Sequence, residues 1–574
     1  MTDDPTRPRR ATVLDRPAPP PPLSPDPVER AQEPLTDYGH ARRVLSVYGE
    51  DLIYTSERGW GAWTGTHYRL GKQGDIAARR IFETLPLLLD EEARAWAAAP
   101  VAETDIERLR QQELGRLPSR RKVPSFDPDA AVEEQRALVE RHIRWTRRQT
   151  LEEAAEKAAR VRTIRDVKAA AETSCLVPFE SLDAEPWRLA VLNGTLDLAR
   201  VVEPSPDGET EEEEAERRAR WLLPHDRAMR PTRACGVAFD PTAECPEWRR
   251  FIALITSDRP AVRGGEPRPD PEMAAYLKRC LGKLLLGENK PPAALFIQGE
   301  GANGKSLMFD TIAHVLGSYV ERVVMEMFLW SGRERDPAAA SQHEVVLPGA
   351  RCYLAIETRE GSVLDDGALK RYAGGDATKS RANYDDLFEW TPSGTPVLVF
   401  NPMPEIKAAD HGTQRRIFFV PLRVRLDELP QELRREQAEV KGALRAEGPG
   451  ILNWLCEGLA DLHALGGLCP PPHAELHKTT MLSESDPVGA FVDAALRPDP
   501  VSRVRMPDFN DVFKLWAPEN GYGKARVHTA KQVLRQRGFD IGPVRGSECL
   551  KGWAWNGEAD IEALRDRARR IKGE

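Results

Sequence analysis

Residues 293–306 read AALFIQGEGANGKS, and this stretch decides the fold of the central part of the chain. Its apolar first half, Ala293 to Gln298, has the length and composition of a buried parallel strand. The residues that follow it, Leu307 to Leu316, have the pattern of an amphipathic helix. A strand, a glycine-rich loop and a helix in this order predict a nucleotide-binding α/β unit.

The loop itself supplies each group that a bound triphosphate needs. Glycines let the backbone turn its N–H groups inward, and the start of the helix adds positive potential. Lys305 provides a charge for the β- and γ-phosphates, and Ser306 provides a hydroxyl ligand for Mg²⁺. We therefore predict ATP and Mg²⁺ as ligands. The predicted ATP-binding residues are Gly299, Glu300, Gly301, Ala302, Asn303, Gly304, Lys305 and Ser306.

Two later strands end in polar side chains that suit ATP hydrolysis. Arg351 to Ile356 precedes Glu357, a candidate magnesium-directed acid that polarises the attacking water. The apolar strand that ends at Phe400 precedes Asn401, a candidate sensor of the γ-phosphate. The alternatives are a surface glutamate and an ordinary asparagine–proline turn.

Arg416 is the fourth predicted catalytic residue, beside Lys305, Glu357 and Asn401. It follows the segment 410–415 and precedes the strand-like Ile417 to Val420. An arginine at the mouth of a strand can reach a neighbouring subunit's ATP. The alternative is that Arg415 and Arg416 are ordinary surface residues that form salt bridges.

These motifs, in this order and spread over little more than a hundred residues, resemble the superfamily 3 helicases, which are AAA+ ring motors. The wider chain resembles the phage and plasmid primase-helicase family, related to the poxvirus nucleoside triphosphatase. The resemblance covers about residues 45–560. It is carried by NGTLDL at 193–198, GANGKS at 301–306, LKRYAGGD at 369–376 and FNPMP at 400–404. Ile356 and Phe400 depart from the serine and threonine common in the family.

The resemblance implies a five-stranded AAA+ sheet, a ring, which we expect to be a homo-hexamer, and a hairpin over Thr378 to Thr391 that enters the ring's channel. Lys379 and Arg381 alternate on the first hairpin strand and share one face. Such a face can follow a phosphate backbone, so both are predicted to bind DNA. Single-stranded or forked DNA and replication proteins are the expected partners.

The whole chain is predicted to be an α/β protein in four parts. Residues 1–36 are proline-rich and are expected to be a disordered leader. Residues 37–245 should form a mixed α+β and helical domain, with the acidic run at 209–216 as an exposed loop. The AAA+ P-loop ATPase core should cover 246–475, and a winged-helix domain 486–560.

The winged-helix prediction rests on three helical patterns followed by two short strands after residue 486. The third predicted helix, Thr529 to Arg537, carries Lys531 and Arg535, which we expect to contact DNA. Arg526, Arg537 and Arg545 lie nearby in sequence. The alternative is a small packing module with a solvated basic face.

Composition sets limits on function and location. The 574 residues and net charge of −8 describe an ordinary chain rather than a globally basic nucleic-acid coat. No apolar run approaches the about 20 residues that cross a bilayer, so we expect no membrane contact and a cytoplasmic protein in a bacterial host. The eight cysteines form no Cys-x-x-Cys pair and should be reduced thiols.

Three functions remain open from the sequence. We favour an ATP-driven, ring-forming DNA helicase of a phage, prophage or plasmid replication system. A bifunctional primase-helicase is the first alternative, although the first ~180 residues hold no zinc-binding cysteine set. A non-unwinding ATP switch that binds an origin is the second, and Ile356 beside Glu357 favours it.

Overall fold

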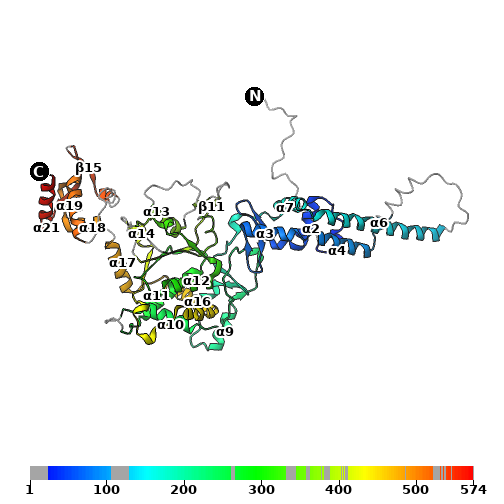
Figure 1. Ribbon diagram of the computed structural model, residues 1–574, viewed down its shortest axis with the longest axis horizontal. Coiled ribbons are helices and arrows are strands. Elements are labelled where there is room, and N and C mark those ends of the chain that lie inside the picture. The colour runs from blue at the N-terminus through cyan, green and yellow to red at the C-terminus, as the bar shows by residue number, and fades with distance from the viewer. Residues whose placement is uncertain are drawn as a thin grey trace, which may run out of the picture. The chain divides into compact units, whose positions relative to one another are not determined.

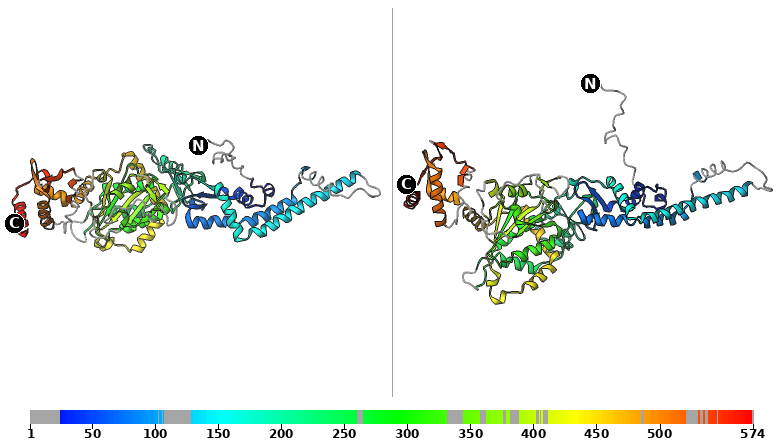
Figure 2. Two further views of the ribbon diagram at one scale, coloured as in Figure 1. Left: turned by 90° about the horizontal axis from the view of Figure 1, so that it is seen from above. Right: turned by 45° about the horizontal axis from the view of Figure 1, so that its top comes forward.

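The computed structural model is shown in Figures 1 and 2. Two compact units divide the chain, Met1–Leu182 and Asp183–Glu574, and each is described separately. Within the described ranges, every helix is too short or too polar to cross a lipid bilayer. The structure describes residues 24–572 apart from 102, 105, 107–127, 260–264, 331–343, 357–361, 376–377, 381–387, 402–403, 405, 407–410, 485–486, 521–529, 532–533, 536–537 and 545.

The first unit combines a small antiparallel sheet with long helices. The long helix α6 runs beside α4, as both figures show. The apolar core of the first unit is built from α2, α3, α4, α6, α7 and the sheet. The elements are α1 (Pro27–Arg30), α2 (Asp37–Tyr48), β1 (Leu52–Thr55), β2 (Gly59–Trp63), β3 (Tyr68–Arg69), α3 (Gly71–Phe82), α4 (Leu85–Ala98), α6 (Pro128–Ala158) and α7 (Val161–Cys175).

A buried charge cluster anchors α1 in this unit. Glu92 of α4 is fully buried and accepts hydrogen bonds from Arg30 Nε at 3.2 Å and Arg43 Nε at 2.8 Å. Arg147 of α6 donates to the carbonyl oxygens of Ala31 and Glu33. The prediction that the disordered leader reaches residue 36 is therefore wrong for its last part, because α1 is held by buried hydrogen bonds. Residues 1–23 lie outside the described ranges.

The second unit begins with a small antiparallel sheet in the order β4-β5-β6. Its acidic run is not a loop: Glu211–Ala219 forms helix α9. Thr210 and Glu213 form a capping box, and four glutamates stand in the first turn, where the helix dipole favours negative charge. The elements are β4 (Arg188–Val191), β5 (Gly194–Asp197), α8 (Leu198–Val201), α9 and β6 (Leu222–Leu223).

The centre of this unit is a parallel five-stranded sheet, which confirms the predicted α/β core. The strands lie in the order β13-β7-β12-β9-β8, and every neighbouring pair is parallel. Apolar side chains from the strands and the surrounding helices form one buried core, as expected for a parallel sheet. The strands are β7 (Ala294–Gln298), β8 (Val320–Val323), β9 (Cys352–Ile356), β12 (Thr395–Phe400) and β13 (Ile417–Pro421).

Helices lie around this sheet, and α11, α12 and α16 are seen together beside it in Figure 1. A short antiparallel pair, β10 and β11, stands apart from the main sheet. These elements are α10 (Pro246–Ile255), α11 (Pro271–Gly282), α12 (Lys305–Leu316), α13 (Asp366–Gly374), β10 (Thr378–Ser380), β11 (Phe388–Trp390), α14 (His411–Gln414), α15 (Gln437–Ala446) and α16 (Gly448–Ala464).

The C-terminal part has its own apolar core and a three-stranded antiparallel sheet in the order β14-β16-β15. Two of its elements were not predicted, the long edge strand β14 and the last helix α21. Pro498 and Pro500 lie inside β14, at the edge of the sheet and beside a break in its register with β16, where proline is tolerated. The elements are α17 (Pro472–Glu484), α18 (Pro487–Ala495), β14 (Leu496–Arg505), α19 (Met506–Glu519), β15 (Ile541–Val544), β16 (Ser547–Trp555) and α21 (Ala559–Lys572).

All eight cysteines are free thiols, as predicted, and only Cys469 is exposed. Burial raises the pKa of the Cys175 and Cys235 thiols to about 12. Protonated, buried thiols of this kind behave as small apolar side chains.

Candidate nucleotide site and nucleic-acid contacts

The glycine-rich loop follows β7 and leads into α12 with the backbone geometry of an anion cradle. Gly301 and Gly304 have φ values of +100° and +80°, which a side chain would strain. A Cβ on Gly299 would lie 2.9 Å from the carbonyl oxygen of Leu422. The two positive φ values and the tight contact explain why this loop needs glycine at three places.

Lys305 lies at the first position of α12, and its amine turns back onto the loop. Its Nζ donates to the Gly299 carbonyl oxygen at 2.5 Å and to Asn303 Oδ1 at 3.0 Å. Burial lowers the pKa of the Lys305 amine to about 8. The amine is therefore held next to the loop by neutral polar partners and has no carboxylate partner among the described residues.

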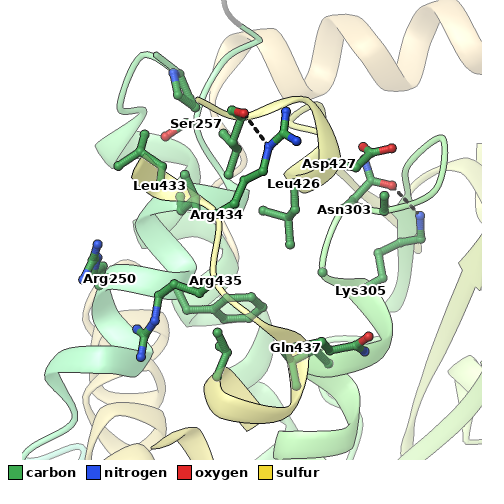
Figure 3. A pocket seen from close by; sticks show the side chains of 18 of the residues that line it. Arg250, Ser257, Asn303, Lys305, Leu426, Asp427, Leu433, Arg434, Arg435 and Gln437 are labelled. Carbon is green, nitrogen blue, oxygen red and sulfur yellow. Dashed lines mark hydrogen bonds between the residues drawn. The ribbon is translucent and has the colours of Figure 1, made fainter. Parts of the chain in front are cut away.

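Asn303 connects this lysine to the neighbouring strand. Its amide nitrogen donates to the carbonyl oxygens of Leu422 and Val424, both at 3.1 Å, just beyond β13. The side chain is buried, and its amide oxygen accepts from Lys305 (Figure 3). Asn303 was predicted to bind ATP, but its structural partners were not predicted, because they come from a segment more than a hundred residues later.

A cavity of about 920 Å³ opens beside the loop. One end is lined by residues 301–307, including the exposed hydroxyl-bearing Ser306, together with Asn401. The other end lies between α10, the segment after β13 and α15 (Figure 3). Its apolar lining consists of Phe251, Leu254, Leu426, Leu429, Leu433 and Val440.

Three arginines also line this cavity, and sequence reasoning missed all of them. Arg250 is exposed and forms no ion pair with any residue that the structure describes. Arg434 Nε donates to the Leu429 carbonyl oxygen at 2.7 Å, and Arg435 pairs with Glu247 and Glu439. No motif marks these residues, because they belong to segments that meet only in the fold.

Asn401 lies directly beyond the carboxyl end of β12, and its role as a sensor of the γ-phosphate stays a prediction. Phe400 pairs with Gln298 of β7, so Asn401 and Gly299 follow paired residues on adjacent strands. The chain leaves β7 toward one edge of the sheet and leaves β12 toward the other. Such a reversal opens a crevice at the carboxyl ends of the strands, where α/β proteins bind ligands.

Glu357 lies outside the described residues, so its role stays a prediction. The strand before it is described: β9 ends at Ile356, which pairs with Val399 of β12. This register places the end of β9 at the carboxyl ends of the strands, where the phosphate loop also lies.

Arg416 lies at the amino ends of the strands, whereas the phosphate loop lies at their carboxyl ends. It precedes β13, whose first residue pairs with Ala294 and whose last residue pairs with Gln298. The five residues of β13 therefore separate it from the level of the loop, about 20 Å over six steps of 3.3 Å. Its Nη1 donates to the Gly412 carbonyl oxygen at 2.6 Å, and its Nε is buried without a hydrogen-bond partner among the described residues. The structure does not bring Arg416 into its own subunit's cavity.

The predicted hairpin is described only at its base. β10 and β11 pair antiparallel, with Lys379 opposite Glu389. The backbone of Lys379 therefore lies in a hairpin strand as predicted. Arg381 and the turn lie outside the described residues.

The predicted DNA contacts of the C-terminal part share one carboxylate. Lys531 Nζ lies 2.5 Å from Glu548 Oε2, and Arg535 Nη2 lies 3.6 Å from Glu548 Oε1. The hydrogen bond from Lys531 holds the pKa of the Glu548 carboxyl below its usual range. Glu548 belongs to β16, so the second hairpin strand places a negative charge against the predicted contact residues. Arg526, Arg537 and Arg545 lie outside the described residues.

Comparison with known proteins gives a family for the first part of this arrangement. Residues 41–257 match the family described as D5 N terminal like. This part of the chain is similar to D5 N-terminal-like domains. The match confirms the resemblance to the primase-helicase family that the motifs indicated. The D5 N-terminal-like domain begins inside α2 and ends just after α10, so it contributes Phe251 and Leu254 to the cavity.

Viral relatives carry names that describe them as candidate helicases. L207/L206 of Acanthamoeba polyphaga mimivirus is 29% identical over 154 residues, 27% of this chain and 16% of the relative. V13 of Sputnik virophage is 26% identical over 141 residues, 24% of this chain and 18% of the relative. Protein 022R of Frog virus 3 is 23% identical over 308 residues, 50% of this chain. Each match spans less than a third of the relative's own length.

Among solved structures, the apo NrS-1 C-terminal region is similar to this chain with a TM-score of 0.32 and 11% identity. That likeness covers 54% of this chain and 76% of the other.

Proposed function

We propose that this protein is an ATP-dependent DNA helicase of a phage, prophage or plasmid replication system, built on an AAA+ core of the superfamily 3 type. The observation that carries the proposal is the cavity beside the phosphate loop. It joins a cradle for phosphates, a lysine, the Asn401 side chain and an apolar end large enough for a base. The D5 N-terminal-like domain and the viral relatives agree with a replication enzyme.

In this proposal each group of cavity residues binds a different part of the nucleotide. The β- and γ-phosphates take the place of Gly299 and Asn303 as partners of the Lys305 amine. The loop N–H groups bind the phosphate oxygens, and Asn401 contacts the γ-phosphate from the adjacent strand. Phe251, Leu254 and Val440 cover the faces of the base, which favours a planar aromatic group over water.

The residues fit Mg²⁺ bound largely through phosphates. Among the described residues no group of three or more His, Cys, Asp or Glu side chains could hold a metal ion. Mg²⁺ is commonly bound by one or two protein oxygens together with substrate phosphates and water. Ser306 and Glu357 would hold it, and when bound it neutralises charge that develops on the phosphates.

Arg416 acts on a neighbour in this proposal. It lies at the amino ends of the strands, away from its own subunit's cavity. In this proposal it therefore contacts the ATP of a neighbouring subunit. We therefore propose a ring, with the homo-hexamer of the family as the expected form. DNA passes the hairpin with Lys379 and Arg381, and a winged-helix module bearing Lys531 and Arg535 holds duplex or forked DNA.

Mixing experiments test the shared site. Lys305→Ala and Arg416→Ala subunits should each lose ATP turnover, since arginine fingers are worth about 10³–10⁵ in rate in other nucleotide hydrolases. A mixture should recover part of the turnover, because some interfaces pair an intact loop with an intact Arg416. If the mixture stays inactive after subunit exchange is confirmed, or a monomer hydrolyses ATP at the full rate, the ring mechanism is wrong.

A bifunctional primase-helicase is the second candidate, favoured by the match of residues 41–257 to the D5 N terminal like family. Nucleotide incorporation on a single-stranded template, which should persist in the Lys305→Ala variant, separates it from a helicase alone. ATP turnover stimulated by single-stranded DNA separates both from a non-unwinding switch.

A further inference from the structure

Helix α6 of the first unit presents an indole to solvent among basic side chains. Trp145 is 59% exposed, and the tryptophans of the apolar core, such as Trp60 at 2%, are buried. The nine residues 141–149, RHIRWTRRQ, contain four arginines and no carboxylate. More than half of the Trp145 surface is therefore open to a ligand.

The helix periodicity gathers donors around the indole. At about 100° per residue, Arg141 and Arg148 lie within about 60° of Trp145 on the helix surface. His142 and Gln149 lie at similar angles on the other side of Trp145, so the described positions one turn before and after it are all polar. A protein contact surface normally has an apolar centre of several residues. Here a single aromatic ring stands between cationic and hydrogen-bonding groups.

Two of the arginines on this face are available. Arg141 is exposed and forms no ion pair with the described residues. Arg148 pairs with Glu152 at 2.8 Å, but both side chains are about half exposed, and exposed pairs of this kind are weak. Arg147 points inward to the carbonyl oxygens of Ala31 and Glu33 and is already used in the fold.

We propose that Arg141, Trp145 and Arg148 form a binding surface for single-stranded nucleic acid. The indole stacks on one base, which is tolerant of sequence because every base has an aromatic face. The two guanidinium groups bind phosphates on either side of that base. Along the helix they are about 10 Å apart, at 1.5 Å per residue. That span matches two or three nucleotides at about 3.4 Å or more each.

This surface is separate from the nucleotide cavity, the predicted channel hairpin and the predicted winged-helix contacts. It lies in the first compact unit, whereas those sites lie in the second. It requires no ATP. A failure of this proposal therefore leaves the helicase proposal intact, and a failure of ATP turnover leaves this surface untouched.

The test is equilibrium binding of the full chain to a fluorescein-labelled oligothymidylate without nucleotide, measured by anisotropy. Trp145→Ala should weaken binding about fivefold or more, because base stacking on an aromatic side chain is worth at least 1 kcal/mol. Trp145→Phe should keep most of the affinity. Arg141→Gln should weaken binding and reduce the slope of log affinity against log salt by about one.

Leu87→Ala is the matched control, since Leu87 is a 69% exposed apolar side chain on α4 of the same unit, and it should bind as the wild type does. Far-ultraviolet circular dichroism confirms that the Trp145 variants are folded. Wild-type affinity in Trp145→Ala overturns the proposal. So does unchanged affinity combined with an altered oligomeric state in sedimentation, which would make Trp145 a contact with a second copy of the chain. Equal losses in Trp145→Phe and Trp145→Ala overturn the stacking role.

Discussion

Replacing Glu92 by glutamine tests how the first unit holds its N-terminal segment. Both carboxylate oxygens of Glu92 are occupied, one by Arg30 and one by Arg43, and the side chain is fully buried. Burial raises the pKa of the Glu92 carboxyl, and the two guanidinium groups oppose that rise. Glutamine keeps the size of the side chain but removes the charge and one acceptor. The buried Arg43 guanidinium would then lose its carboxylate partner, and Arg30 would keep only the half-exposed Glu91.

The expected cost is about 3–5 kcal/mol, the range for removing one partner of a buried ion pair. The adjacent Glu91 offers a matched control, because it also pairs with Arg30 but is 55% exposed. Glu91→Gln should cost about 1 kcal/mol or less, as exposed pairs do. The same substitution, one residue apart, therefore separates the effect of burial from the effect of charge.

Hydrogen exchange with mass spectrometry is the appropriate assay, because a chain with more than one compact unit does not unfold in a single step. Peptides from α2 and α4 should lose protection by about two to three and a half orders of magnitude in Glu92→Gln, at 1.4 kcal/mol per tenfold change. The same peptides in Glu91→Gln should change by about fivefold or less. Equal loss of protection in the two variants would refute the assignment of Glu92 as the buried centre of this cluster.

Three further predictions concern the second unit. Free Lys305 has a pKa of about 8 and bound phosphate favours its charged form, so ATP affinity should fall as pH rises through about 8. Titration calorimetry at several pH values would show this. Lys305→Arg is the control, because its guanidinium stays charged and its ATP affinity should not change with pH. The same pH-independent affinity in the wild type would contradict the prediction. Asn303→Ala should weaken ATP binding by about 5- to 150-fold, since buried carbonyl oxygens and Lys305 lose a partner. Unchanged affinity would mean that Lys305 needs no support. Glu548→Gln should strengthen binding of forked DNA in low salt by freeing Lys531 and Arg535, and an unchanged affinity in a filter-binding assay would speak against DNA contacts at those residues.

The central fold was predictable because its signals are local. The apolar run of β7, the glycines and the amphipathic α12 follow one another within 24 residues. The positions of Asn401 and Arg416 also followed from strand ends. The parallel sheet that carries these residues could be predicted once each apolar run was taken as a strand.

The rest depended on contacts between distant segments or on weak patterns. The apolar end of the cavity combines α10, the segment after β13 and α15, none of which has a motif. β14 was hidden by Pro498 and Pro500, which usually argue against a strand. α21 buries Ile561, Leu564 and Ala568 on one face but is otherwise charged, so its periodicity is faint. The helix α9 was hidden by its run of glutamates, which reads as a loop until the capping residues are considered.

The strand β13 has a mechanical consequence for a ring of such subunits. It is hydrogen-bonded to β7 along its whole length, and the chain just beyond it grips the phosphate loop through Asn303 and through Leu426 N–H to the Ala302 carbonyl oxygen. Arg416 stands at its other end. In the proposed ring, a shift of the phosphate loop on nucleotide binding would be carried along this strand to Arg416. Nucleotide binding in one subunit would then change the position of the arginine that contacts its neighbour, through a strand of only five residues.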